Sequence, residues 1–197
     1  MSCDCEIEAQ NDEQKKILII LLLINGSMFV LELVLGLLAE STALIADALD
    51  MLADAAVYTV SLYAVGRNEW HKVSAARISG FFQIVLGLGV LLEVVRRFIS
   101  GSTPEPLFMI GLGVLALIAN SICLALIAKH RDGEIHMRAS WIFSRNDVIA
   151  NLGVILAGVL VATTGSNLSD LLIGAVIAAV VVLGGRRILL EARSPGN

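Results

Sequence analysis

The chain carries little charge for its length. Asp, Glu, Lys and Arg make up 16% of its 197 residues and hydrophobic residues make up 57%, whereas about a quarter of the residues in soluble globular domains are charged. The net charge of −4 leaves no basic surface of the kind that binds nucleic acid. The shortage of charge therefore disfavours both a water-soluble domain and a nucleic-acid partner.

Cysteine is scarce as well. The chain has three cysteines, and their number and placement exclude a disulfide framework. Cys3 and Cys5 form a Cys-x-Cys pair in a polar N-terminal segment, which suits a soft metal ion, although we expect two reduced thiols. Cys123 lies in an apolar run, where we expect it to serve only in packing.

We expect no cleavable signal peptide in the N-terminal segment. Residues 1–14 are acidic, and no small-residue cleavage site follows a short apolar core. We therefore expect residues 1–14 to form an acidic tail, and the first apolar run to stay in the membrane.

Long apolar runs are what the chain has in abundance. A helix needs about 20 apolar residues to cross the hydrocarbon core of a bilayer, and six segments joined by short polar connections meet this length. We predict an all-α polytopic membrane protein in which residues 15–193 form six transmembrane helices. Only a short tail, 194–197, follows, with no soluble C-terminal domain. The predicted spans are residues 17–38, 43–66, 75–99, 107–128, 139–163 and 169–190.

Basic residues predict the orientation of these spans. Lys and Arg gather in cytoplasmic connections of membrane proteins. With the N-terminus in the cytoplasm, 11 of the 14 Lys and Arg residues fall on that side, and only Arg96 and Arg97 fall on the other. We therefore predict that both termini are cytoplasmic and that the protein lies in the inner (plasma) membrane of the cell.

The second predicted span carries three carboxylates. Asp50 and Asp54 point within about 40° of each other and lie roughly 6 Å apart along a helix axis, and Asp47 joins the same face one turn earlier. A carboxylate within a bilayer costs a few kcal/mol or more and usually marks a pathway or a site. Three such acids on one stripe cannot all be ionised without a cation between them. The stripe therefore indicates a cation site, with Asp47 either a ligand or a brace.

The fifth predicted span contains polar residues that could join the acids of the second span in one site. Asp147 and Asn151 are four residues apart, again on one helix face. If the second and fifth spans pack together, Asp50, Asp54 and Asp147 can converge, and an amide or a water completes a four-coordinate oxygen site. The alternative for any one of these acids is a structural hydrogen bond between helices.

Other polar residues in the spans have simpler explanations. Glu32 is a candidate relay acid, whereas Glu93 is placed for an ion pair with Arg96 and Arg97. Arg145 is either a partner of Asp147 or a headgroup contact. Amides and imidazoles are assigned by position. We expect Asn25 and Asn120 to form hydrogen bonds between helices, and His71, His130 and His136 to contact headgroups at the cytoplasmic ends of the spans, with recruitment of ions by residues 129–138 as the alternative.

These runs resemble a known family. Residues 40–54, with a small-Asp-Ala step at Ala46-Asp47-Ala48 and then two Asp residues four apart, resemble the second transmembrane helix of the cation diffusion facilitators. Residues 146–151 are similar to the fifth helix of that family. The six spans, the cytoplasmic termini and the Glu-x-x-Arg-Arg run that closes the third span before a proline are also similar. The resemblance covers about residues 15–193.

The resemblance implies a homodimeric metal–proton antiporter, not an enzyme, that exports divalent cations, with zinc first and cadmium, cobalt, iron or manganese open. It places Asp50, Asp54 and Asp147 at the transport site, so the ion is cargo and no cofactor is implied. The family usually has His or Asp four residues before the fifth-helix Asp, but Phe143 stands there. Asn151 or a water takes that place, which makes the donor set harder and weakens the preference for zinc.

A second departure is the missing cytoplasmic domain, which helps longer members of the family to dimerise; the chain looks like a short form. The mechanism implied is that carboxylates release protons when they bind the metal, so that alternating access exchanges metal for protons.

Two other functions remain open from the sequence. Intramembrane prenyltransferases also use an Asp-rich helix to hold a magnesium diphosphate, but the chain has no second D-x-x-x-D run for that chemistry. A passive cation channel or a non-transporting subunit is the other alternative.

Overall fold

The computed structural model describes residues 2–38, 42–101 and 104–193, with side chains described for residues 7–34, 50–101 and 104–193. In the described residues the chain forms six α-helices, one short 3-10 helix and no strands, which confirms the predicted all-α class. The helices are α1 (Ser2–Leu38), α2 (Thr42–Ala64), α3 (Glu69–Ser100), α4 (Pro106–Ile127), η1 (Ala128–His130), α5 (Ile135–Thr164) and α6 (Leu168–Glu191).

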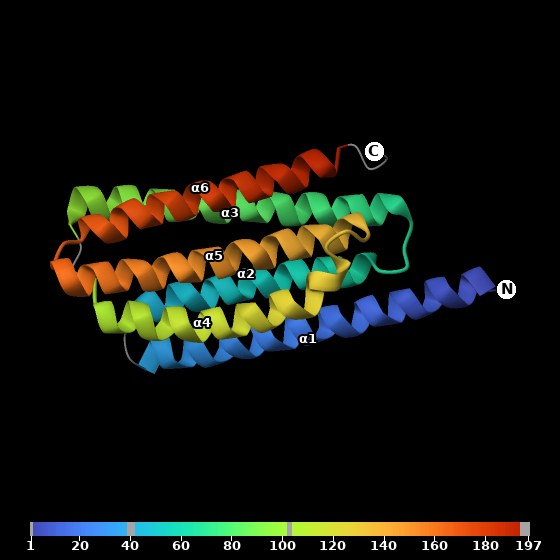
Figure 1. Ribbon diagram of the computed structural model, residues 1–197, viewed down its shortest axis with the longest axis horizontal. Coiled ribbons are helices and arrows are strands. Elements are labelled where there is room, and N and C mark those ends of the chain that lie inside the picture. The colour runs from blue at the N-terminus through green and yellow to red at the C-terminus, as the bar shows by residue number, and fades with distance from the viewer. Residues whose placement is uncertain (1, 39–41, 102–103, 194–197) are drawn as a thin grey trace.

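The six long helices run up and down beside one another (Figure 1). α3 and α6 lie along one side of the bundle, α1 and α4 lie along the other, and α2 and α5 lie between them. α1 begins and α6 ends at the same end of the bundle, where the α2–α3 and α4–α5 connections also lie. We call this end the termini end, and the opposite one the far end.

Five of the helices that the structure describes are long and apolar enough to cross a membrane: α1, α3, α4, α5 and α6. α2 is the remaining long helix, and its side chains are described only from residue 50 onward. It carries three Asp residues, and because carboxylates are costly within a bilayer, they need cover from neighbouring helices. The central position of α2 provides that cover.

Three helices begin well before the predicted spans, whereas α2 ends at Ala64, two residues before its predicted end. α1 begins at Ser2, so the acidic segment expected to be a tail is part of the helix. Acidic side chains are favourable near a helix N-terminus, where the backbone N–H groups carry partial positive charge. α3 and α5 likewise start six and four residues before the predicted spans. Hydropathy locates the apolar centre of each helix, but it does not show how far the helix continues into water.

Local chemistry sets the helix ends. Asn68 caps α3, because its side-chain oxygen accepts a hydrogen bond from the backbone N–H of His71. Pro106 occupies the first turn of α4, where its missing N–H has no partner to lose. Gly165 ends α5 with a positive φ of 66°, a conformation that glycine adopts without strain.

Glycine also permits the closest helix approach in the bundle, between α3 and α6. A Cβ atom added at Gly185 would lie 2.7 Å from the backbone oxygen of Gly80. Because backbone atoms cannot rotate out of the way, only glycine fits there. This contact holds α6 directly against α3.

Large apolar side chains cover much of the outer surface. Leu92, Phe98, Ile99 and Leu107 are each at least 71% exposed. Their clustering around the α3–α4 connection gives the far end an apolar surface suited to lipid. The bundle thus exposes large apolar side chains on its surface and buries several polar ones, as expected of a protein that lies in a membrane.

Candidate metal centre between α2 and α5

Two hydroxyl pairs join α2 to α5. The Tyr58 hydroxyl lies 2.8 Å from the Ser144 Oγ, and the Ser61 Oγ lies 2.7 Å from the Ser140 Oγ. All four side chains are fully buried. Short hydrogen bonds between buried groups on neighbouring helices fix how far one helix is shifted along the other.

The two pairs define an antiparallel register, because the residue number rises along α2 as it falls along α5. One helical turn beyond the Tyr58–Ser144 pair, the same register sets Asp54 opposite Asp147. A further turn sets Asp50 opposite Asn151. Residues four apart lie on one face of a helix, so the acids fall on the faces that the hydroxyl pairs already bring together.

The carboxyl groups of this register are close and sheltered. Asp54 is 0% exposed, and Asp147 and Asn151 are each 7% exposed, while Asp50 is half-buried. Asp54 interacts electrostatically with both Asp147 and Asp50, and the interaction with Asp147 is the stronger of the two. The structure therefore brings together the second-span and fifth-span acids that the sequence singles out.

These acids have unmet capacity to bind a cation. Both carboxylate oxygens of Asp54 and the Oδ2 of Asp147 have no hydrogen-bond partner among the residues that the structure describes. The amide nitrogen of Asn151 also lacks a partner in the described part of the chain, but it is a hydrogen-bond donor and binds no cation. Buried polar atoms are nearly always satisfied in folded proteins, so the three carboxylate oxygens point to a ligand that supplies positive charge or protons.

The described acids do not form a complete metal-coordination site. Among the side chains that the structure describes, no three His, Cys, Asp or Glu groups converge tightly enough to hold a metal ion. Asp54 and Asp147 form the close pair, Asp50 lies at its edge, and Asn151 adds an amide. The described geometry thus offers a two-carboxylate centre with further oxygen donors within one turn on each helix.

Phe143 is fully buried and lies one turn before Asp147 on α5. Its ring has no donor atom, so this position supplies no ligand. In the register set by the hydroxyl pairs, Phe143 falls beside Tyr58. The side of the centre nearest the termini end is therefore closed by two aromatic rings.

A third and a fourth helix border the same region. Asn25 on α1 donates a hydrogen bond from Nδ2 to the Sγ of Cys123 on α4, at 3.4 Å. Cys123 packs in the same buried cluster as Tyr58. This contact confirms the expected interhelical role of Asn25 and the expected packing role of Cys123. For Asn120, both polar side-chain atoms are buried without a partner among the described residues.

Other expectations have mixed outcomes. Glu93 pairs with Arg96 and Arg97 as expected. Arg145 is exposed, and its guanidinium lies 5.8 Å from the ring centroid of Trp141, so it points away from the buried Asp147. Glu32 is fully buried in α1. The side chains of Asp47, Cys3 and Cys5 lie outside the described residues.

The expectation for the histidines is wrong in two places. His136 is 0% exposed and His130 is 8% exposed, so neither side chain reaches toward headgroups. His136 lies at the start of α5, where α3 packs across it. Sequence position placed these residues at the end of a span, but it could not show that the neighbouring helices cover them.

The two hydroxyl pairs between α2 and α5 are the part of the site that sequence reasoning missed. Tyr58 and Ser61 share a face with Asp54, and Ser140 and Ser144 share a face with Asp147, at spacings of three, four and seven residues. That spacing was the available signal. Hydroxyls are common in membrane helices, so the signal gains meaning only once α2 and α5 are known to touch.

Comparison with known proteins identifies the family of the chain. A family model described as the cation efflux transmembrane domain matches residues 18–194. The chain is 26% identical over 194 residues to the zinc transporter ZitB of Yersinia pestis, covering 92% of this chain and 62% of the relative. It is 25% identical to a cadmium, cobalt and zinc/H(+)-K(+) antiporter of Bacillus velezensis, covering 96% and 66%.

A third relative, the metal cation efflux system protein CzcD of Cupriavidus metallidurans, is 25% identical over 88% of this chain and 58% of its own length. The chain thus spans about three-fifths of the length of such relatives. The family model covers nearly all of the described residues, including both helices of the carboxylate centre. The chain belongs to the cation efflux family, and the α2–α5 centre lies within its transmembrane domain.

Proposed function

We propose that the protein moves a divalent transition-metal cation out of the cytoplasm in exchange for protons, with Asp50, Asp54, Asp147 and Asn151 as the transport ligands. The observation that carries the proposal is the buried Asp54–Asp147 pair, in which both oxygens of Asp54 and the Oδ2 of Asp147 lack hydrogen-bond partners among the described residues. Membership of the cation efflux family supports cation transport. Zinc is the first candidate cargo.

The chemistry of the pair supports an exchange rather than simple binding. Two carboxylates in a site of low polarity need compensation by positive charge, which either a divalent cation or protons can supply. A carboxylate must lose its proton before it binds a metal. The two cargoes therefore compete for the same oxygens, and occupation by one expels the other. If the site opens to alternate sides, this competition couples metal export to proton import.

The proposed identity of the transported metal rests on the relatives and on the donor atoms of the site. The relatives' names include zinc alone and a group of cadmium, cobalt and zinc. Phe143 removes the position at which an imidazole is expected, so the donors are oxygens, which suit harder ions better than imidazole does. We propose zinc with a selectivity weaker than a site containing histidine would give, extending to cadmium, cobalt, iron or manganese.

The proposed setting is a homodimer in the inner membrane, with the termini end in the cytoplasm. The termini end holds most of the basic residues of the connections, as the positive-inside rule requires. The apolar outer surface provides the lipid-facing area. A dimer contact through the helices is the form that the family resemblance implies.

Purified protein in sealed liposomes tests this function. We expect zinc uptake into vesicles to be accompanied by proton release, read with a pH-sensitive dye trapped inside. A proton ionophore controls for leak, and empty liposomes control for passive metal entry. Metal uptake without opposing proton movement indicates a channel and contradicts the exchange. Absence of uptake for every metal in the series zinc, cadmium, cobalt, iron and manganese contradicts transport by this chain alone.

The family is one of cation transporters and not of enzymes, so the prenyltransferase alternative has no support. The passive channel and the non-transporting subunit are the outcomes that the liposome experiment separates.

A further inference from the structure

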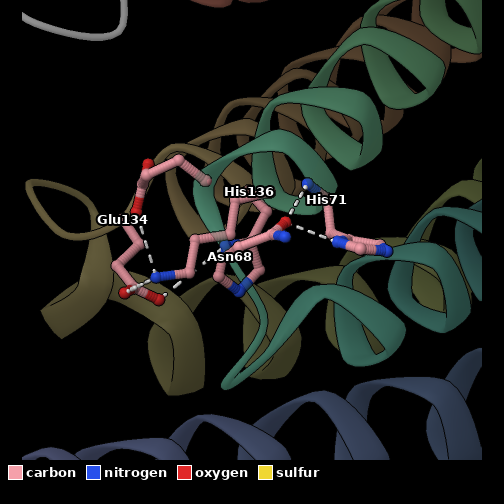
Figure 2. A network of polar contacts seen from close by, with 6 residues as sticks. Asn68, His71, Glu134 and His136 are labelled. Carbon is pink, nitrogen blue, oxygen red and sulfur yellow. Dashed lines mark hydrogen bonds and ion pairs between the residues drawn. The ribbon is translucent and has the colours of Figure 1, made fainter.

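A second polar cluster lies at the termini end, where α3 and α5 begin. Figure 2 shows the network of polar contacts around Glu134 and His136. Lys72 on α3 forms an ion pair with Glu134, which caps α5, and a second one with Glu69 at 3.3 Å. His136 lies behind Glu134, with its Nδ1 3.9 Å from the Glu134 Oε2. The ammonium group of Lys72 is thus held between two carboxylates, with an imidazole adjacent.

The imidazole in this cluster is unusual because it is buried without a hydrogen-bond partner among the described residues. His136 is 0% exposed, and neither ring nitrogen has a hydrogen-bond partner among the described residues. The Glu134 Oε2 atom that faces it is also buried and unpartnered. The 3.9 Å between them exceeds a hydrogen bond, so the two atoms face each other without bonding.

Their separation suits a shared metal ion. Two ligand atoms that each lie about 2.1 Å from a tetrahedral zinc are roughly 3.4 Å apart. The observed 3.9 Å between Nδ1 and Oε2 therefore needs a side-chain movement of about half an ångström. Imidazole and carboxylate are the donors that zinc and cobalt accept together. Glu69, whose side chain is 74% exposed, can swing in as a third donor.

The cluster also stands at one end of a continuous polar stripe. His136 and Asp147 are 11 residues apart on α5, which is about three turns, so they share a helix face roughly 16 Å apart along the axis. Ser140 and Ser144 lie between them on the same face and pair with hydroxyls of α2. The stripe leads from the termini end to the carboxylate centre.

We propose that Glu134, His136 and Glu69 form an entry site for a divalent cation, in which the Lys72 ammonium takes the place of the metal in this conformation. An arriving ion displaces Lys72 from Glu134 and binds the imidazole and carboxylates. Lys72 competes with the metal ion for the carboxylates of Glu134 and Glu69. This competition keeps the metal affinity of the entry site low, so that a bound ion can leave it for the carboxylate centre.

Further passage of the ion along the α5 stripe requires the buried rings of Tyr58 and Phe143 to move, because they close the side of the centre nearest the termini end. The cargo role rests on the proposed function, but metal binding at the cluster does not.

Metal binding to purified full-length chain tests the proposal, with cobalt as a spectroscopic probe and zinc as its competitor. The background carries Asp54→Asn, Cys3→Ser and Cys5→Ser, which removes the central centre and the tail thiols. In that background we expect Lys72→Met to raise cobalt affinity at least about tenfold and to add visible absorption from a nitrogen-ligated ion. His136→Asn and Glu134→Gln, each added to Lys72→Met, should abolish the gain.

Lys15 offers a control, because it pairs with Asp12 on α1 at 3.5 Å and both side chains are about half exposed. Lys15→Met should leave cobalt affinity unchanged. An equal gain from Lys72→Met and Lys15→Met would show a general charge effect and overturn the entry site, as would a gain that survives His136→Asn. Gel filtration confirms folding, and Lys72→Gln replaces Lys72→Met if the latter aggregates.

The experiment separates this inference from the proposed function. Binding that depends on His136, in a chain whose liposomes move no metal, leaves the site intact and contradicts only transport. Metal–proton exchange by a chain that shows no His136-dependent binding leaves the function intact and contradicts only the entry site.

Discussion

The hydroxyl of Tyr58 on α2 lies 2.8 Å from the hydroxyl of Ser144 on α5, one helical turn from the Asp54 and Asp147 carboxylates. This hydrogen bond fixes the register of α2 against α5 next to Asp54 and Asp147. A slip of one residue would rotate the acids by about 100° away from each other, and the centre would be lost.

The Tyr58–Ser144 bond should therefore couple stability to transport. In a double-mutant cycle with Tyr58→Phe and Ser144→Ala, we expect a coupling energy of about 1 kcal/mol, within the range for interhelical hydrogen bonds in membranes. Thermal unfolding in detergent measures it. Thr59→Val is the matched control, because Thr59 bonds only to the Ala55 carbonyl of its own helix. Additive effects of the two substitutions would show that the bond does not join α2 to α5.

Phe143→His should restore an imidazole beside the carboxylate pair. Histidine is smaller than phenylalanine, so it fits the buried position without overpacking. We expect the ratio of zinc to manganese transport in liposomes to rise about tenfold, since imidazole favours zinc over manganese. Phe143→Leu controls for loss of the ring and should leave the ratio unchanged. An unaltered ratio in Phe143→His would place the metal away from this turn of α5.

Gly185→Ala should separate α6 from α3. The new Cβ atom would meet the Gly80 backbone oxygen at 2.7 Å, and overpacking of this kind costs about 1–3 kcal/mol. Gly89→Ala on α3 is the control, because no atom lies within 4 Å of its added Cβ, so it should be neutral or slightly stabilising. A thermal unfolding series in detergent distinguishes them. Equal stability of the two variants would contradict the close α3–α6 approach.

The sequence predicts the helices better than it predicts what they bring together. Hydropathy locates the six helix centres, because a span must be apolar whatever its neighbours are. The acid stripe is also visible, because a carboxylate in such a run is costly. The ends are less visible: α1 continues through the acidic segment to Ser2, where hydropathy gives no signal.

Contacts between helices cannot be read in the same way. The hydroxyls of Ser61 and Ser140 are ordinary residues for a membrane helix until α2 is known to lie against α5. His136 was expected to contact headgroups, yet it is fully buried, because α3 crosses above the start of α5. Both facts depend on packing between segments far apart in the chain, which one sequence does not specify.

The most direct test of the carboxylate centre compares zinc uptake by liposomes that contain wild-type protein, Asp54→Asn or Asp50→Ala. Asp170→Asn is the matched control, because Asp170 pairs with Arg97 at the far end, outside the centre. We predict that zinc uptake and the accompanying proton release fall at least about a hundredfold in Asp54→Asn and Asp50→Ala and persist in Asp170→Asn. Wild-type uptake in Asp54→Asn, from protein that is folded and inserted, would contradict the account.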